Sequence, residues 1–183
     1  MKDNSGERKI CWVITGAGHF LRECAKLIAS FGEVDVYLTR AAMEVAPRYG
    51  VMATIERASG GISREEGYSS APLIRFSSGK YSLLVIAPAT SNTMAKCALG
   101  IADSLASNFF AQAGKSGVPI VVLPTDVASR MTSETPSGRM ISVTPRPIDL
   151  EHTEAVSKFP GVSVVLSVAD LAGAAAPYLA PGK

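Results

Sequence analysis

Cysteine, histidine and tryptophan are scarce in this chain of 183 residues, which has three cysteines, two histidines and one tryptophan. Cys11, Cys24 and Cys97 lie far apart and form no C-x-x-C pair, so neither a disulfide framework nor a zinc site is indicated. His19 and His152 are too few for a histidine-rich metal centre. The sequence therefore predicts no metal site, and reduced thiols in the cytoplasm.

The chain also lacks an excess of one charge and lacks long apolar runs. Eighteen Lys and Arg face sixteen Asp and Glu, a formal net charge of +2, without the clustered basicity of nucleic-acid-binding proteins. No stretch reaches the ~18 apolar residues of a membrane span, and residues 1–9 are polar without the apolar segment of a secretory signal. We expect neither nucleic acid nor a membrane as a partner.

Apolar residues are abundant, at 47% of the chain. A chain of this length and composition can fill one well-packed core and is short for two. We expect a single domain over residues 1–183, with its core at about 9–176 between a polar N-terminal tail and a loose C-terminal tail.

The strongest local pattern is a buried strand followed by a polar loop. Apolar, partly β-branched residues at 82–87 predict a strand that stops at Pro88, and Thr90-Ser91-Asn92-Thr93 follows. Ser91 or Asn92 can cap a helix over 93–99, which would place side-chain oxygens and backbone N–H groups at a helix N-terminus. Such a loop suits an anion or a polar heterocycle, although an ordinary capped connection has the same pattern.

Strands and helices alternate along the rest of the chain. Apolar runs predict further strands at 10–15, 34–38, 119–123, 140–143 and 162–166. Helical spacing predicts helices at 20–31, 41–49, 103–115, 149–159 and 169–176. Residues 52–79 have no sustained period of either kind, and 127–144 are polar with a turn at 136–138.

This alternation predicts an α/β fold of the Rossmann-like (flavodoxin-like) type, a three-layer sandwich with a mostly parallel sheet. Ligands of such sheets bind beyond the carboxyl ends of the strands. Four of these ends carry a threonine: Thr15, Thr39, Thr90 and Thr125. Gly16 and Gly18 lie beside the first, where glycine lets the backbone approach a ligand. The recurrence predicts one shared polar site.

The glycine loop does not fit a dinucleotide. The G-x-G-x-x-G fingerprint requires a third glycine where this chain has Leu21, and an acidic residue at the end of the second strand, where it has Thr39-Arg40. A hydroxyl and a cation suit a phosphate monoester better. The pattern therefore indicates a mononucleotide such as FMN rather than NAD.

Residues 88–93, Pro-Ala-Thr-Ser-Asn-Thr, followed by Gly-Ile-Ala-Asp at 100–103, resemble the P-A-S-A-N-T signature and the G-x-A-D segment of the FMN-binding flavoprotein superfamily. This superfamily includes phosphopantothenoylcysteine decarboxylases and flavin prenyltransferases. Residues 12–16, 34–38 and 79–81 are most similar to archaeoflavoproteins and dihydromethanopterin reductases. Together with the strand ends, the resemblance implies FMN, with Thr39 at its phosphate, bound by Gly16, Ala17, Gly18, Thr39, Ala89, Thr90, Ser91, Asn92, Thr93, Asp103 and Thr125.

Differences between this sequence and the motifs of the family's members distinguish among the activities of the family. The decarboxylases use a histidine before the central strand and a Met-containing motif after the next one. This chain has no histidine between His19 and His152, and Pro124-Thr125-Asp126 at that strand end, so cysteinyl decarboxylation lacks its proton-handling side chain. The prenyltransferases carry a lysine where this chain has Asn92. The resemblance therefore implies an FMN-dependent oxidoreductase that passes electrons from a donor through FMN to dihydromethanopterin.

Other functions stay open because no catalytic residue can be named. The main alternative is an electron-transfer flavoprotein between protein partners; a cysteinyl decarboxylase is less favoured, and a non-catalytic flavin binder also remains. A redox protein is the candidate electron donor. For a pterin, residues 52–79 and 127–147 are expected to be mobile and to build the pocket, the second with Arg130, Arg139 and Arg146. The superfamily further implies a homo-oligomer, a trimer or a multiple of trimers, packed through the helix at 103–117.

Overall fold

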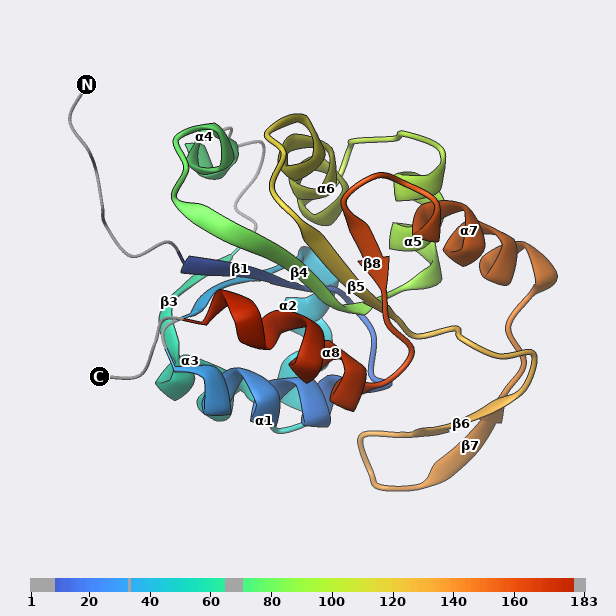
Figure 1. Cartoon of the computed structure of the whole chain (residues 1–183). Helices are drawn as coiled ribbons and strands as arrows, with labels where there is room; N and C mark the ends of the chain where they lie inside the picture. The colour runs from blue at the N-terminus through green and yellow to red at the C-terminus, as the bar shows by residue number, and fades with distance from the viewer. Residues whose placement is uncertain (1–8, 33, 65–70, 180–183) are drawn as a thin grey trace.

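Six parallel strands form the central sheet, and the computed structural model describes residues 9–32, 34–64 and 71–179 of the chain. In spatial order the strands are β3 (Ser59–Arg64), β2 (Val34–Leu38), β1 (Lys9–Ile14), β4 (Tyr81–Ala89), β5 (Ile120–Pro124) and β8 (Val162–Val164). A separate antiparallel hairpin consists of β6 (Met131–Glu134) and β7 (Met140–Val143). It projects from the body of the molecule at the side where the parallel strands end (Figure 1).

Helices cover both faces of the sheet (Figure 1). One layer contains α1 (Leu21–Phe31), α2 (Arg40–Arg48), α3 (Met52–Ala58) and α8 (Val168–Ala175), followed by the short 3₁₀ turn η1 (Ala176–Tyr178). The other contains α4 (Ala71–Ser77), α5 (Ser91–Ala98), α6 (Leu105–Lys115) and α7 (Pro147–Ser157). The predicted α/β fold with its mostly parallel sheet is confirmed. None of the helices in the described ranges combines the length and apolar character needed to cross a bilayer.

The segment that lacked a period in the sequence, 52–79, is not an open excursion in its described part. It forms α3, the edge strand β3 and α4, and β3 pairs in parallel with β2. The sequence of β3, Ser-Gly-Gly-Ile-Ser-Arg, has a single large apolar residue, Ile62. An edge strand has one neighbour and needs no continuous apolar run, so its pattern is weak. Residues 65–70 lie outside the described ranges.

Three predicted boundaries around the signature loop were wrong. Strand β4 continues through Pro88 to Ala89, and the cap of α5 is Thr90, whose side chain accepts a hydrogen bond from the Thr93 N–H. Helix α6 begins at Leu105 with Ser104 as its cap, so Asp103 precedes the helix. A cap has an extended backbone and precedes the first helical residue, which shifts each boundary by one or two positions.

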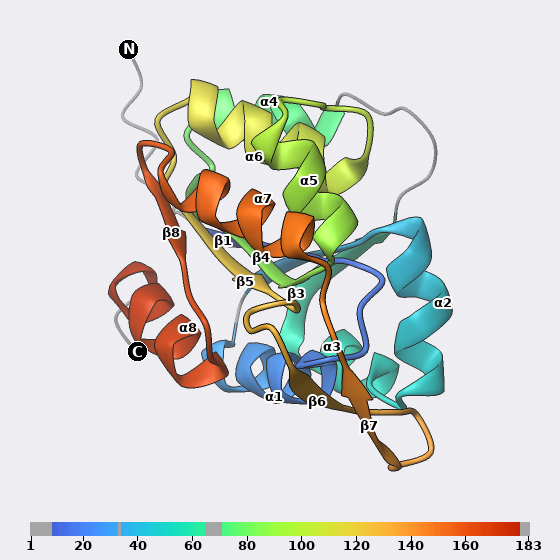
Figure 2. The same cartoon turned by 90° about the vertical axis from the view of Figure 1, so that its right-hand side faces the viewer.

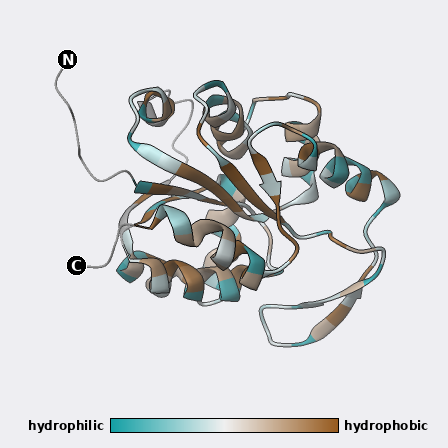
Figure 3. Cartoon of the chain, in the orientation of Figure 1, coloured by the Kyte–Doolittle hydropathy of each residue, from teal (hydrophilic) through white to brown (hydrophobic). Residues whose placement is uncertain are grey.

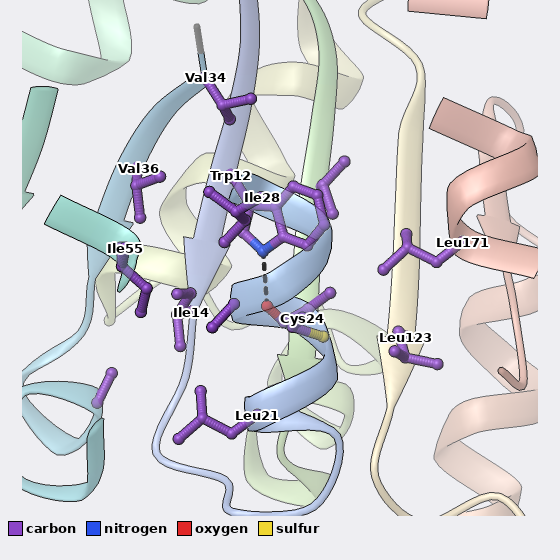
Figure 4. Packing of buried hydrophobic residues seen from close by; sticks show 14 of the residues in the cluster. Trp12, Ile14, Leu21, Cys24, Ile28, Val34, Val36, Ile55, Leu123 and Leu171 are labelled. Carbon is purple, nitrogen blue, oxygen red and sulfur yellow. Dashed lines mark hydrogen bonds between the residues drawn. The ribbon is translucent and has the colours of Figure 1, made fainter. Parts of the chain in front are cut away.

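Trp12 lies at the centre of the core beneath the sheet. Its side chain is fully buried among residues of β2, α1, α3 and α8, and Figure 4 shows Cys24 and Ile28 of α1 beside the indole ring. The indole Nε1–H donates a hydrogen bond of 2.7 Å to the carbonyl oxygen of Ala87 in β4. The donor is therefore satisfied inside an apolar cluster, as a buried indole requires. Figure 3 shows the hydrophobic stretches of the central strands that the two helical layers cover.

A polar cluster lies on the opposite face of the sheet, at the start of β2. The carboxylate of Asp35 accepts hydrogen bonds from Lys80 Nζ at 2.6 Å and Tyr81 Oη at 3.0 Å. The hydroxyls of Tyr81 and Tyr37 are 2.8 Å apart, and Arg75 Nη1 donates to Tyr37 Oη at 2.8 Å. Every polar group of this cluster has a partner, so the buried carboxylate is compensated.

We expect this cluster to make the stability of the protein depend on acid pH. Burial raises the pKa of Asp35, but hydrogen bonds from Lys80 and Tyr81 and the charges of Lys80 and Lys9 outweigh it and leave the pKa below its usual value. A lowered pKa gives stability above the unfolded value of about 3.9, which is lost as the pH falls through the folded pKa. Urea unfolding between about pH 6 and 3 should show this loss. Asp35→Asn should flatten the pH dependence, and an unchanged slope would contradict the assignment.

Candidate functional site at the carboxyl edge of the sheet

A pocket of about 370 Å³ opens at the carboxyl edge of the sheet, within the size range of small-molecule sites. The strand order reverses at β1, which lies between β2 and β4, so this edge is a topological switch point where α/β folds bind ligands. Figure 2 looks onto this edge, with the hairpin β6–β7 below α7. The lining residues come from three strand ends and the hairpin: Ala17, Gly18, His19, Thr90, Ser91, Asn92, Thr125, Asp126, Met131, Ser133 and Val143.

The three strand ends are tied together by hydrogen bonds beyond the sheet. Thr15 Oγ1 donates to the carbonyl oxygen of Pro88 at 2.7 Å and accepts from the Thr90 N–H at 3.0 Å. The Thr125 N–H donates to the carbonyl oxygen of Ala89 at 2.9 Å. The loops after β1, β4 and β5 therefore form one rigid floor.

The first loop has glycine where a side chain would collide with α2 and the residue after it. A Cβ at Gly16 would lie 2.4 Å from the Cβ of Ala41, and a Cβ at Gly18 would lie 1.9 Å from Tyr49 Oη. The space beside Gly18 lets the Tyr49 hydroxyl reach the hairpin, where it donates to the carbonyl oxygen of Glu134 at 2.9 Å. The absence of a side chain at Gly18 therefore lets Tyr49 hold the hairpin, which forms one wall of the pocket.

Arg22 of α1 strengthens the same anchor. Its guanidinium lies 5.4 Å from the centre of the Tyr49 ring and donates to the Tyr49 carbonyl oxygen at 2.8 Å. It also donates to the carbonyl oxygen of Pro136 at 3.1 Å, at the tip of the hairpin. The hairpin is thus held against α1 and the end of α2 by Tyr49 and Arg22.

Two titratable side chains line the pocket, Asp126 and His19. The Asp126 carboxylate accepts a hydrogen bond from Ser91 Oγ, and Thr125 Oγ1 lies 3.4 Å from the same oxygen. Partial burial lowers the pKa of His19, which the nearby Glu23 and Asp126 carboxylates partly offset. A neutral imidazole is therefore favoured, with one nitrogen as a donor and the other as an acceptor.

Six of the predicted site residues line the pocket: Ala17, Gly18, Thr90, Ser91, Asn92 and Thr125. The others lie elsewhere. Gly16 lies against Ala41 of α2, and Ala89 is fully buried in β4. Thr93 is buried next to Thr90, with the two hydroxyls 3.1 Å apart. Thr39 caps α2 by accepting from the Ala42 N–H at 3.2 Å, and Asp103 pairs with Lys96 of α5 at 2.6 Å.

Of the two segments expected to build the pocket, residues 127–147 do contribute, through Met131, Ser133 and Val143. The expectation was wrong for the other segment and for the three arginines, because no described residue of 52–79 lines the pocket and none of Arg130, Arg139 and Arg146 does. Arg146 is bound by Asp149 at the start of α7, through Nη2 at 2.7 Å and Nε at 3.0 Å, which lowers the pKa of Asp149. The hairpin supplies uncharged residues, Met131 and Ser133 from β6, which has no strand signal in the sequence, and Val143 from β7.

Among the residues that the structure describes, no three histidine, cysteine, aspartate or glutamate side chains gather as a metal site would require. The three cysteines are free and buried, and burial raises the pKa of Cys97 to about 12. Cys97 is therefore an inert thiol of the core.

The pocket and fold agree with a comparison against known families, in which the family described as Flavoprotein matches residues 1–178. The chain belongs to the Flavoprotein family. The resemblance found in the signature loop is thereby confirmed.

Two curated relatives of this flavoprotein carry the name dihydromethanopterin reductase (acceptor). The one from Methanosarcina mazei is 40% identical over 142 residues, which cover 70% of this chain and 59% of the relative. The one from Methanocaldococcus jannaschii is 42% identical over 131 residues, which cover 64% of this chain and 53% of the relative. This flavoprotein thus spans little more than half the length of these two relatives.

A solved structure resembles this flavoprotein over nearly its whole length. DmrB of Burkholderia xenovorans, solved in complex with FMN and described as a cubic protein cage for redox transfer, superimposes with a TM-score of 0.86 and 34% identity. The match covers 96% of this chain and 97% of DmrB. The fold of this flavoprotein is therefore shared with a protein of similar size.

Proposed function

We propose that this flavoprotein binds FMN at the carboxyl-edge pocket and is an oxidoreductase that reduces dihydromethanopterin or a closely related dihydropterin. The observation that carries the proposal is a polar pocket at the switch point of the sheet, in a chain 40–42% identical to two dihydromethanopterin reductases and 34% identical to DmrB, which was solved with FMN. Electrons pass from a donor, for which a redox protein is the candidate, through FMN to the pterin.

The residues present fit FMN. The loop after β1 presents Ala17 and Gly18 to the pocket, and the absence of a Cβ at Gly16 and Gly18 lets this loop lie against Ala41 and Tyr49. At the start of α5, the first-turn N–H groups of Ser91 and Asn92 have no acceptor within the helix, so they favour a ligand with negative charge. When bound, FMN supplies electron transfer, and the protein positions the ring and excludes competing reactions.

The binding part of the proposal is tested by the absorption spectrum of the purified protein, before and after incubation with FMN, FAD or NAD. We expect flavin bands and selective retention of FMN. A spectrum without flavin bands after incubation with excess FMN would overturn this part.

The chemical part is tested by anaerobic stopped-flow mixing of the chemically reduced flavoprotein with dihydromethanopterin or a dihydropterin analogue. Rapid reoxidation of the flavin by the pterin is expected. Absence of pterin-dependent reoxidation, together with rapid reoxidation by a ferredoxin-like protein, would favour an electron carrier instead.

We predict that Thr39 contributes to FMN retention through its hydroxyl. The Oγ1 atom accepts from the Ala42 N–H, which leaves the hydroxyl proton to donate to the phosphate. Thr39→Ala should weaken FMN binding by about 1–3 kcal/mol and, because the cap of α2 is lost, lower the stability by about 1 kcal/mol. Thr39→Ser keeps the hydroxyl and should bind FMN as the wild type does. Equal FMN affinity of the alanine and serine variants in fluorescence titrations would contradict this role.

We further propose one domain, a cytoplasmic location and a homo-oligomer, a trimer or a multiple of trimers. Helix α6 buries Ala106, Phe109 and Ala113 against its own sheet, so that face is not available to a neighbour. Leu99 and Met140 have exposed apolar side chains, on the α5–α6 connection and on the hairpin, and are candidates for subunit contacts. Light scattering of the FMN-loaded protein at micromolar concentration should give such an assembly, and a monomer would contradict it.

A further inference from the structure

The pocket has a single carboxylate among its described lining residues, and one oxygen of that carboxylate accepts no hydrogen bond from the described residues. Asp126 follows β5, is half-buried and lines the pocket beside Ser91. Both hydroxyl contacts of its side chain, from Ser91 and Thr125, are to Oδ2. The Ser91 contact fixes the side chain. Oδ1 is free to accept from a ligand, and because the Thr125 contact is long at 3.4 Å, Oδ2 keeps a lone pair for one further hydrogen bond.

No cation of the described chain neutralises this carboxylate. Within the ranges that the structure describes, no lysine or arginine nitrogen lies within 4.0 Å of Asp126. The charge of Asp126 does act on Arg146, but the Arg146 guanidinium is already bound by Asp149 through two nitrogens. A half-buried carboxylate without a cation favours a ligand that brings N–H donors.

The 2-amino-4-oxopyrimidine ring of a pterin brings such donors. Its ring N3–H and exocyclic 2-amino group are adjacent and coplanar, so they can donate two parallel hydrogen bonds to one carboxylate. Hydrogen bonds to an ionised acceptor are stronger than those between neutral groups, and a two-point contact also fixes the orientation of the ring. Met131 and Val143 of the hairpin give the pocket an apolar wall for a flat ring system.

The same carboxylate fits the flavin ring poorly. The pyrimidine edge of an isoalloxazine presents one N–H between two carbonyl oxygens, so a carboxylate that accepts from the N–H faces two other acceptors. Repulsion of the wrong edge and attraction of the right one together give specificity. Asp126 therefore favours binding of the pterin ring over binding of the flavin ring, the two ring systems of the proposed reaction.

We propose that Asp126 is a specificity-determining residue, which binds the 2-aminopyrimidinone edge of the pterin substrate while Ser91 holds its carboxylate in place. This inference rests on the proposed function and adds the group that selects the substrate. It predicts a preference for pterins over lumazines, in which a carbonyl replaces the 2-amino group and one of the two donors is lost.

The test measures binding rather than turnover, by calorimetric titration of the FMN-loaded protein with 6-methylpterin and with 6-methyllumazine at pH 7. Neither oxidised ligand reacts with oxidised FMN. The wild type should bind the pterin at least tenfold more tightly than the lumazine. Asp126→Asn should weaken pterin binding at least tenfold and leave lumazine binding unchanged or tighter. Asp170→Asn, the same change at an exposed position of α8 outside the pocket lining, should bind both ligands within about threefold of the wild type.

Each outcome bears on a separate claim. Equal affinity of the wild type for the two ligands, or no pterin binding, overturns the role of Asp126 without any variant. So does an Asp126→Asn protein that binds the pterin like the wild type, or one that loses FMN, which would assign the carboxylate to the flavin. If reduced wild-type protein is also not reoxidised by a dihydropterin, the proposed function fails as well. Reoxidation with no pterin preference leaves the proposed function standing.

Discussion

Gly18→Ala should weaken FMN binding at least tenfold and lower the free energy of unfolding by about 1–3 kcal/mol, the usual range for overpacking. The added methyl group would lie 1.9 Å from Tyr49 Oη and 2.3 Å from Tyr49 Cζ, so the tyrosine ring must move. Its hydrogen bond to the carbonyl oxygen of Glu134 would then break. The hairpin that carries Met131, Ser133 and Val143 would lose its anchor, and the pocket its wall.

Gly114→Ala is the matched control for this substitution. Gly114 lies inside α6, and a Cβ there meets no atom within 4 Å. Alanine is favoured over glycine in a helix, so this variant should bind FMN normally and gain up to about 1 kcal/mol. FMN affinity is measured by the quenching of flavin fluorescence and stability by urea unfolding. A Gly18→Ala protein with wild-type FMN affinity would show that the Tyr49 anchor does not shape the pocket.

Trp12→Ala should lower the free energy of unfolding by about 3–5 kcal/mol, the range for deleting a large buried aromatic side chain. The ring is fully buried and packs edge-on against Phe31, with 6.1 Å between ring centres. The substitution leaves a cavity and removes the hydrogen bond to the Ala87 carbonyl oxygen. Trp12→Phe keeps most of the volume and should lose about 1–3 kcal/mol through the unpaired carbonyl.

The measurement needs a probe other than fluorescence, because Trp12 is the only tryptophan of the chain. Urea unfolding followed by far-ultraviolet circular dichroism meets this need. Ile74→Ala is the control, since Ile74 on α4 is 64% exposed and should change stability by less than about 0.5 kcal/mol. A loss below about 1 kcal/mol for Trp12→Ala would contradict the central place of this residue in the core.

Strands buried on both faces could be predicted from the sequence, whereas of the strands at an edge β7 and β8 were predicted and two were not. β1, β4 and β5 contain continuous apolar runs, and β2 is apolar apart from Asp35, because helices cover both sides of these strands. β3 and β6 were missed. β3 has one large apolar residue, and β6 belongs to a two-stranded hairpin that has no second layer over it. Burial between two layers requires apolar residues, so elements with little burial have only a weak apolar pattern in the sequence.

The site could be predicted where it depends on strand ends and not where it depends on contacts distant in sequence. Thr90 and Thr125 follow buried strands, so their shared edge follows from the parallel sheet. The contact of Tyr49 with Glu134 joins residues 85 positions apart and has no local signal. Asp103 belongs to the family motif, yet its side chain is occupied by Lys96. Asp126 lies at the predicted strand end, but only the structure shows that no lysine or arginine of the described ranges pairs with it.

The Thr15 hydroxyl, bonded to Pro88 and Thr90 at once, also bears on the kinetics of ligand exchange. These bonds hold the floor of the pocket in a single arrangement before any ligand arrives, so little ordering entropy is lost on binding. Association with a preformed site requires no folding step, and related ligands then arrive at similar rates. Differences in affinity among these ligands will then come from their dissociation rates. The residence time of the pterin on the protein is therefore set by the contacts that it makes above this floor.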